Sequence, residues 1–137
     1  MKLSKTSEYA IRILSFMARD PEKKYAAKYL VEQLHISDKY LRRILTKLSK
    51  EGLIISKQGR EGGYIFNKKI QEIFLSDIID ASEGIEKYLG CVLGFEKCSD
   101  EQPCAFHAKW VSVRQNIVAN LNSTSLADIN FSENIRY

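Results

Sequence analysis

The chain has 137 residues, of which 45% are hydrophobic and 28% charged, and its formal net charge is +4. This length and composition predict one domain with a substantial core and a short appendage. The sequence has no run of about eighteen apolar residues and no charged-then-apolar leader. It therefore argues against membrane spanning and secretion, and makes the cytoplasm the expected location.

Charge is divided unevenly along the chain. Residues 1–69 contain 16 Lys and Arg against 7 Asp and Glu, whereas residues 70–137 contain 5 against 10. A basic first half suits a polyanionic partner, and an acidic second half suits a different task. With only two histidines and no nucleophile–base set in the sequence, an enzyme is not expected.

A first helix is predicted from its cap at Ser4 to the residues before Asp20-Pro21, because proline disfavours helical geometry in the residue that precedes it. Its apolar residues form one stripe: Tyr9, Ala10, Ile13, Leu14, Phe16 and Met17. Glu8 lies near the start of this helix, where the helix dipole favours a carboxylate.

A second short helix, Ala26 to Leu34, and a three-residue turn lead into a helix over 37–52, with Ser37 as its cap and Gly52 as a left-handed stop. The apolar residues of this third helix follow one stripe: Tyr40, Leu41, Ile44, Leu45 and Leu48. Its other face is basic: Lys39, Arg42, Arg43, Lys47 and Lys50. On an isolated helix such a face is more often a solvated surface, so the neighbouring elements decide the interpretation.

Residues 53–57 and 63–66 are predicted to form a two-stranded hairpin around a glycine-rich turn. A helix, a tight turn, a basic helix and a hairpin are together typical of a winged helix–turn–helix, which lays its second helix in the DNA major groove. The residues expected to contact DNA lie on the basic helix and the wing: Ser37, Lys39, Tyr40, Arg42, Arg43, Lys47, Lys57, Arg60 and Gly62. For the wing, a plain hairpin turn that needs glycine for its geometry is an equally good interpretation.

The second half contains two more predicted helices. Ser76 is the expected cap of a short helix that stops near Gly84, and residues 84–103 show no period, which predicts a loop. Pro103 suits the first position of a long helix, whose apolar residues recur every three or four positions at Phe106, Trp110, Val113, Ile117 and Leu121, with Val111 and Val118 beside them. Such a stripe can cover its own core, but near the end of a small DNA-binding chain it is typical of a dimer. Residues 123–125 interrupt the helix, a last turn is expected at 126–129, and the final residues are expected to be loosely ordered.

The three cysteines, Cys91, Cys98 and Cys104, lie within fourteen residues, and His107 follows them. An odd number of cysteines in a chain without a leader argues against a disulfide framework. Three thiolates and an imidazole suit zinc or an iron–sulfur cluster, but the paired Cys-x2-Cys knuckles of most zinc modules are absent. The spacing favours an iron–sulfur cluster, and the alternatives are zinc, a thiol redox switch and inert buried cysteines. Amides at the start of a helix beginning at Pro103 would favour a negatively charged cluster.

Several short motifs occur in order along the chain: Met1-Lys2-Leu3-Ser4 with Tyr9-Ala10, Ile36-Ser37, Tyr40-Leu41, Leu48, Gly52-Leu53, Gly62-Gly63-Tyr64 and the three cysteines. In these motifs and their spacing the chain resembles the Rrf-type winged-helix transcription regulators, a family with IscR-like and NsrR-like members, along nearly its whole length. The resemblance implies a homodimer that binds a palindromic operator in double-stranded DNA. It also implies that the three cysteines hold an iron–sulfur cluster, either 2Fe-2S or 4Fe-4S.

The resemblance leaves the fourth cluster ligand open between two residues. IscR-like members use a histidine three residues after the last cysteine, which matches His107, whereas NsrR-like members use an acidic residue of the first helix, which matches Glu8. His107 is favoured because it is close in sequence to Cys104, a ligand already placed. Glu8, supplied by either subunit, would instead link the DNA-binding domain directly to the sensor loop. Without these roles, His107 would be a helix-start histidine and Glu8 a surface acid.

Three departures from the family pattern limit what the resemblance implies. The family wing commonly runs Arg-Gly-Pro-Gly-Gly-Gly-Tyr, so Arg60 stands two places from the family arginine. Arg42 stands where IscR-like members have a base-reading glutamate, which predicts a different operator. Six and five residues separate the cysteines instead of five and five, which leaves the cluster type open.

The expected fold is therefore mainly α with a small β wing: a winged helix–turn–helix DNA-binding domain over 1–84, a cysteine-bearing cluster loop over 85–104, and a dimerisation helix with a C-terminal tail over 105–137. The hypothesis is a homodimeric transcription regulator whose operator affinity depends on the cluster. One alternative is a cluster-free thiol, redox or small-ligand sensor on the same scaffold. Another is an iron–sulfur scaffold or electron-transfer protein with a basic docking face, which specific and salt-sensitive operator binding would exclude.

Overall fold

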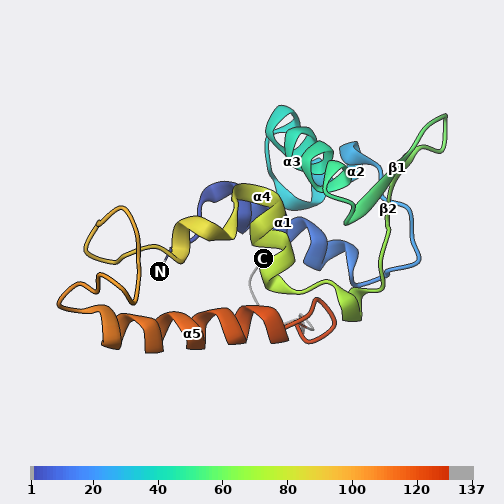
Figure 1. Ribbon diagram of the computed structural model, residues 1–137. Helices are drawn as coiled ribbons and strands as arrows, with labels where there is room; N and C mark the ends of the chain where they lie inside the picture. The colour runs from blue at the N-terminus through green and yellow to red at the C-terminus, as the bar shows by residue number, and fades with distance from the viewer. Residues whose placement is uncertain (1, 130–137) are drawn as a thin grey trace.

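The computed structural model describes residues 2–129, in which a mainly helical body carries a small β hairpin at one end (Figure 1). The helices and strands are α1 (Lys5–Met17), α2 (Ala27–Leu34), α3 (Asp38–Lys50), β1 (Ile54–Lys57), β2 (Gly63–Phe66), α4 (Leu75–Glu83) and α5 (His107–Ser123), with short 3-10 helices η1 (Ile70–Glu72) and η2 (Ile85–Tyr88) on either side of α4. The predicted fold class, mainly α with a β wing, is confirmed. The last residues, which were expected to be loosely ordered, lie outside the described range.

The core is built from the apolar faces of α1, α3 and α4, as the sequence patterns predict. The fully or almost fully buried side chains on these helices are Ala10, Ile13, Leu14, Met17, Leu41, Ile44, Leu45, Leu48, Ile78 and Ile79. Burying one large apolar side chain contributes about 1.5–3 kcal/mol. This packing of its apolar stripe holds α3 with its polar side outward.

The ends of the first three helices follow local sequence signals. Ser4 caps α1 as predicted, since its hydroxyl accepts a hydrogen bond from the Ser7 amide at 3.3 Å. Gly52, with φ +81, provides the predicted left-handed stop after α3, and His35 ends α2 with φ +55. Ser37 occupies the N-cap position of α3, but its side chain makes no capping hydrogen bond.

The hairpin pairs β1 with β2 in antiparallel register, with Ile54 opposite Phe66. A third segment joins it, because the Tyr25 and Tyr64 backbones exchange two hydrogen bonds of 3.0 and 2.8 Å. A Cβ on Gly63 would lie 2.7 Å from the Tyr25 carbonyl oxygen, so the close approach requires glycine. The wing is thus tied to the segment before α2, a pairing that the sequence analysis did not predict.

α4 begins at Leu75, so the prediction that Ser76 caps this helix is wrong. Phe74 occupies the N-cap position, and its amide donates to the Asp77 carboxylate at 2.9 Å. A carboxylate at the third helical position satisfies an amide outside the helix in the way a capping box does. The helix stops at Gly84 as predicted, but η2 follows where only loop was expected.

α5 begins at His107, four residues after the predicted start at Pro103. A turn precedes it, closed by a hydrogen bond of 3.1 Å from the His107 amide to the Cys104 carbonyl. Cys104 and His107 are therefore neighbours across a turn, not on one face of a helix, and the first amides of α5 lie further along the chain than expected. α5 ends at Ser123, and the predicted turn over 126–129 follows, with Leu126 buried against the core.

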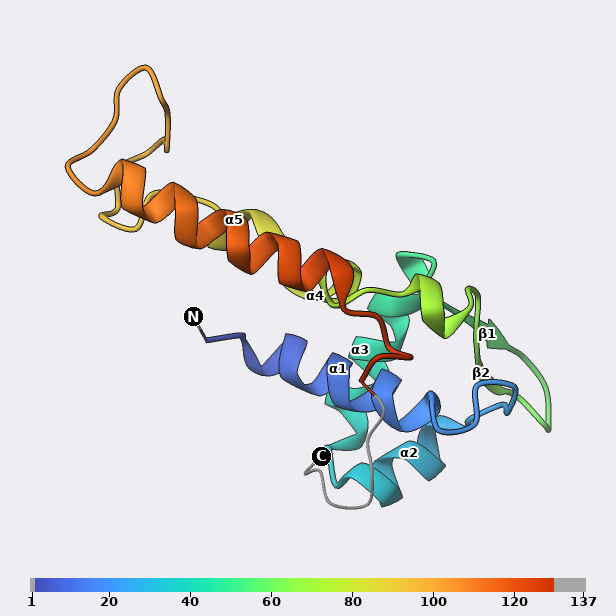
Figure 2. The same cartoon turned by 90° about the horizontal axis from the view of Figure 1, so that it is seen from below.

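α5 is a long rod that packs along α4, and its first turn carries the cysteine loop at the end of the molecule away from the hairpin (Figures 1 and 2). None of its residues is buried. Two members of its predicted stripe, Phe106 and Val113, are 40% and 47% exposed. The stripe therefore covers its own core only in part. Among residues 2–129, no helix is long and apolar enough to cross a membrane.

Candidate functional site

The outward face of α3 is basic. With the apolar stripe buried, Lys39, Arg43 and Lys50 are exposed on the opposite side of the helix. α3 lies at the surface of the body beside α2 and the hairpin (Figure 1). An exposed basic helix next to a wing is the arrangement that enters a DNA major groove. Lys39 and Arg43 therefore suit their predicted role, and the contacts themselves stay predictions; Lys50 shares the same face but was not among the residues predicted to contact DNA.

Arg42 is also exposed, but it forms an ion pair with a neighbouring acidic residue. Its Nε lies 2.9 and 3.0 Å from the two carboxylate oxygens of Asp38, one turn earlier in α3. The two side chains are 52% and 59% exposed, and ion pairs in such positions contribute about 0–1 kcal/mol. A phosphate or a base edge can therefore compete with Asp38 for the guanidinium.

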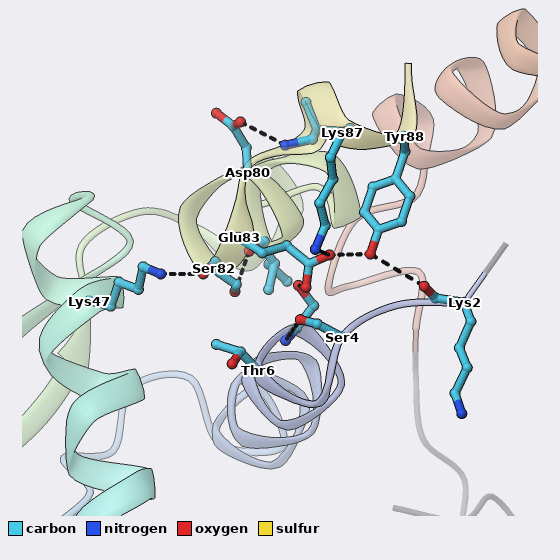
Figure 3. Close-up of polar contacts among 12 residues, drawn as sticks. Lys2, Ser4, Thr6, Lys47, Asp80, Ser82, Glu83, Lys87 and Tyr88 are labelled. Atoms are coloured by element: carbon cyan, nitrogen blue, oxygen red, sulfur yellow. Dashed lines mark hydrogen bonds and ion pairs between the residues drawn. The ribbon is translucent and has the colours of Figure 1, made fainter. Parts of the chain in front are cut away.

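Two members of the predicted DNA-binding set contact the protein itself. The Tyr40 hydroxyl lies 2.6 Å from Thr6 Oγ1, and its ring packs edge-on against Tyr9 with centroids 5.6 Å apart. The Lys47 ammonium donates to the backbone carbonyl of Ser82 at the end of α4 (Figure 3). Positions 40 and 47 lie on the flank of α3 that faces α1 and α4. A DNA contact by either side chain would have to share or break these internal contacts.

At the wing, Lys57 and Arg60 are exposed, in keeping with the DNA contacts predicted for them. Gly62 has a structural requirement instead. A Cβ there would lie 2.6 Å from the Lys57 carbonyl oxygen and 2.8 Å from that of Gly59, and its amide closes the turn on Gly59 at 3.0 Å. This geometry favours the plain hairpin-turn interpretation for Gly62.

The cysteine loop borders a cavity of about 580 Å³, and all three cysteines and His107 line it. The Cys91 and Cys104 sulfurs are 3.8 Å apart, and the Cys98 sulfur lies 3.5 Å from His107 Nδ1. In residues 2–129, no three His, Cys, Asp or Glu side chains are grouped closely enough to hold a single metal ion. The four predicted ligands therefore stand as two pairs around a shared cavity.

His107 is held on its other side by an acid that the sequence analysis missed. Its Nε2 lies 2.7 Å from the Asp100 carboxylate, and the imidazole is only 11% exposed. A carboxylate on one ring nitrogen fixes the orientation of the ring, an arrangement common around metal-binding histidines. The other nitrogen, Nδ1, then faces Cys98 and the cavity. The only sequence signal for Asp100 is an acid two residues after a cysteine.

Backbone amides surround the Cys91 sulfur. The Phe95 amide has the largest effect and lowers the pKa of the Cys91 thiol, helped by the Leu93 and Gly94 amides and opposed by partial burial. Gly94, with φ +85, forms the turn that brings these amides together. Donors around a sulfur stabilise negative charge on it, so this turn favours the thiolate that binds metals.

Glu8, the other predicted fourth ligand, is not among the side chains that line this cavity in the protomer. Its carboxylate is 26% exposed and lies 3.4 Å from the Lys5 ammonium in the first turn of α1. Within one subunit, His107 alone of the two candidates shares the cavity with the cysteines.

A buried carboxylate joins the start of the cysteine loop to the body (Figure 3). Glu83, at the end of α4, has a side chain only 7% exposed. It accepts hydrogen bonds from Ser7 of α1 at 2.5 Å and from the Tyr88 hydroxyl of η2, and its carboxylate lies 3.0 Å from the Lys87 ammonium. Next to it, Ser82 receives the Lys47 ammonium of α3. Residues 82–83 therefore connect α1, α3 and η2.

Glu83 carries its charge in spite of its burial. Burial alone would raise the pKa of Glu83, but hydrogen bonds from Ser7, Tyr88 and Lys87 outweigh it and lower that pKa below its ordinary value. The sequence analysis did not find this residue because one of its partners, Ser7, lies 76 positions away in the sequence. No local pattern joins segments so far apart in the sequence.

α5 also fixes the start of the cysteine loop. The Trp110 indole donates to the Gly90 carbonyl at 2.7 Å, and the Arg114 guanidinium donates to the Leu89 carbonyl at 2.8 Å. Because Gly90 immediately precedes Cys91, these bonds determine where the first cysteine lies relative to α5. Trp110, predicted as a member of an apolar stripe, therefore also acts as a polar anchor.

The chain matches the Rrf2 family, described as "Iron-dependent Transcriptional regulator", over residues 3–130. It is similar to protein rrf2 of Nitratidesulfovibrio vulgaris, with 30% identity over 130 residues that cover 94% of this chain and 87% of that protein. Its fold is similar to that of CymR, the global cysteine regulator of B. subtilis, with a TM-score of 0.78, 27% identity, and 95% and 96% of the two chains covered. For IscR of T. potens the TM-score is 0.73 and the identity 27%, with 94% and 85% covered. This chain, with its exposed basic helix and wing, belongs to the Rrf2 family of transcriptional regulators, which bind DNA and are not enzymes.

Proposed function

We propose that this regulator acts as a homodimer on a palindromic operator, and that an iron–sulfur cluster held by Cys91, Cys98, Cys104 and His107 sets its affinity. The observation that carries the proposal is that these four side chains line one cavity of about 580 Å³. Three of the four are soft sulfur donors, which iron–sulfur clusters require. DNA binding follows from membership of the family. The cluster, the palindromic operator and the dimer are the proposed parts.

The donors suit a cluster better than a single ion. A structural zinc ion needs four donors around one point, at about 2.0–2.3 Å, and no such group of three or more is present in residues 2–129. The amides around Cys91 would stabilise the negative charge of a sulfur-ligated cluster. When bound, such a cluster supplies a group whose oxidation or loss can be sensed. His107 is our choice of fourth ligand because Asp100 orients its ring and Nδ1 faces the cavity.

The operator-binding surface consists of the outward face of α3 and the wing: Ser37, Lys39, Arg42, Arg43, Lys50, Lys57 and Arg60, all of them exposed. Lys50 joins this set because it shares the free face, whereas Tyr40 and Lys47 are engaged inside the protomer. Each phosphate that these cations neutralise would steepen the fall of affinity with salt concentration.

A second copy of the chain would cover apolar surface that one protomer leaves exposed. Among residues 2–129, the large apolar side chains that are at least 40% exposed all lie in the stretch from the cysteine loop to α5: Val92, Leu93, Phe95, Phe106 and Val113. The cysteine loop and the start of α5 lie at the end of the molecule away from the wing (Figures 1 and 2). Two subunits joined there would present their α3 helices on the opposite side, to two half-sites of a palindrome.

The Glu83 network supports a route from the cavity to α3. Binding a cluster would order the loop that starts three residues after Tyr88. Tyr88 and Lys87 are held by Glu83, and the adjoining Ser82 carbonyl anchors Lys47 of the recognition helix. A coupling free energy of about 1–3 kcal/mol along this route would change operator affinity about 5- to 150-fold.

The test is anaerobic reconstitution of the full chain with iron and sulfide, followed by an absorption spectrum and by binding to a duplex selected from random sequence. We expect a coloured protein whose affinity for the selected palindrome changes when the cluster is removed. Colourless protein holding one zinc per chain would refute the cluster. Equal affinity with and without the cluster would refute its regulatory role, and binding without sequence preference would favour the docking-protein alternative.

A further inference from the structure

The three cysteines are not equivalent in their surroundings. Cys91 and Cys104 face each other, with their sulfurs 3.8 Å apart. Cys98 faces the imidazole of His107 instead, at 3.5 Å, and that ring is held in turn by Asp100 at 2.7 Å. All three thiols are half-buried, so small oxidants can reach each of them. The chain therefore contains one thiol pair and one separate thiol.

The closeness of Cys91 and Cys104 follows from anchors on one helix. Trp110 of α5 holds the Gly90 carbonyl at 2.7 Å, which places Cys91 beside that helix. The Cys104 carbonyl accepts the His107 amide at 3.1 Å, which places Cys104 at the start of the same helix. Both cysteines thus sit at the fixed ends of the loop, whereas Cys98 lies near its middle.

We propose that, in the cluster-free protein, Cys91 and Cys104 form a reversible intramolecular disulfide while Cys98 remains a thiol. The sulfurs must approach from 3.8 Å to about 2.05 Å. The exposed segment between them, residues 92–97, contains no helix or strand and can absorb that shift. This inference deepens the proposed function, because the same thiols would hold the cluster.

The chemistry needs a two-electron oxidant, such as the azo compound diamide. The two thiols lose two protons and two electrons as the S–S bond forms, and the N=N bond of diamide is reduced to a hydrazine that takes up both protons. A dithiol reductant reverses the reaction by thiol–disulfide exchange. Since the disulfide consumes two of the three cluster thiols, the oxidised protein cannot bind a cluster through all three.

The experiment uses the full chain in metal-free, fully reduced form, treated with one equivalent of diamide and then alkylated under denaturing conditions. Digestion with trypsin and a glutamate-specific protease cuts after Glu96, Glu101 and Lys109 and so separates the three cysteines into three peptides. We expect Cys91 and Cys104 peptides joined as the main product and an alkylated Cys98. Cys98→Ser should give the same cross-link, whereas Cys91→Ser and Cys104→Ser should not.

A main cross-link that includes Cys98, a cross-link mostly between subunits, or three alkylated thiols would overturn the proposal. Circular dichroism of each variant checks that it is folded before oxidation. This mapping needs neither iron nor DNA, so it stands or fails independently of the cluster. In a second arm, oxidised protein should take up no cluster until dithiothreitol is added. Cluster uptake by the oxidised protein equal to that of the reduced protein would overturn the claim that the disulfide consumes two cluster thiols.

Discussion

The body and the cysteine region of this molecule are stabilised in different ways. In the body, α1, α3 and α4 share a continuous apolar core in which Ile13, Leu45 and Ile78 are completely buried. From residue 84 to residue 124 no residue is buried, although this stretch contains the cysteine cavity and all of α5. The body therefore sets its own shape through packing. The cysteine region relies on a few polar anchors and is suited to change with what it binds.

The largest effect that this contrast predicts is on stability. Leu45→Ala removes a completely buried side chain from α3 and should lower the free energy of unfolding by about 2–5 kcal/mol. Leu93→Ala in the cysteine loop, where the side chain is 55% exposed, should change it by less than about 0.5 kcal/mol. Urea unfolding followed by circular dichroism measures both. Similar losses of unfolding free energy in the two variants would contradict the proposed difference between the body and the cysteine region.

The second prediction tests whether the cysteine region can lose its ligand without harm to the body. Cys98→Ala should abolish the cluster absorption after reconstitution and leave the unfolding free energy of the cluster-free protein unchanged. Its operator affinity should equal that of cluster-free wild type, which we expect to differ about 5- to 150-fold from the loaded form. Ser99→Ala is the matched control and should keep both the absorption and the affinity difference.

Within the body, the third prediction separates two cations of one helix. Arg43→Ala should weaken operator binding by about 1–3 kcal/mol and reduce its salt dependence, because that side chain is on the free face of α3. Lys47→Ala should affect direct binding much less, because its ammonium is held by Ser82. Titrations at several salt concentrations check both. An equal loss for Lys47→Ala would mean that it leaves Ser82 to contact DNA.

The fourth prediction concerns the junction between the two regions. Glu83→Gln keeps the size of the side chain but replaces a charged acceptor of three hydrogen bonds, and should cost about 1–2 kcal/mol of stability. It should also shrink the cluster-dependent difference in operator affinity. Glu86→Gln, on the exposed side of η2, serves as the control. An unchanged affinity difference in Glu83→Gln would remove this residue from the coupling route.

The smallest expected effect is on acid stability. The pKa of Glu83 is lowered in the folded protein, so its stabilising contribution is fully present above its ordinary value of 4.5 and is lost as the pH falls below that value. The unfolding free energy of Glu83→Gln should therefore fall less steeply in this acid range than that of wild type. Parallel pH profiles for the two proteins would show that folding does not lower the pKa of Glu83.

The body was largely predictable because its signals are local. The stripe from Leu41 to Leu48 and the stop at Gly52 are periodic or conformational features of adjacent residues. The errors arose where two local signals compete. Ser76 looks like a cap, but Asp77 makes the capping contact, and Pro103, which is suited to start a helix, instead precedes the turn that leads into α5.

In the cysteine region, the residues that meet around the cavity were predictable, but their anchors were not. The cysteine spacing predicted that the three sulfurs and His107 lie close together, and all four side chains line one cavity. Asp100, Trp110 and Glu83 act through contacts with a ring nitrogen, a backbone carbonyl and residues of distant segments. No periodicity or spacing marks such partners, so only the folded chain reveals them.

The backbone pairing of Tyr25 with Tyr64 has a consequence for operator selection. Because it ties the hairpin to the strand-like segment before α2, the wing cannot swing independently of the helix pair. In the proposed dimer, each subunit would then place α3 and the wing on the duplex as one rigid unit. One extra base pair between the half-sites rotates one half-site by about 36°, because the duplex has about 10 base pairs per turn. This rotation would misalign both α3 and the wing of the second subunit, so that neither could contact its half-site.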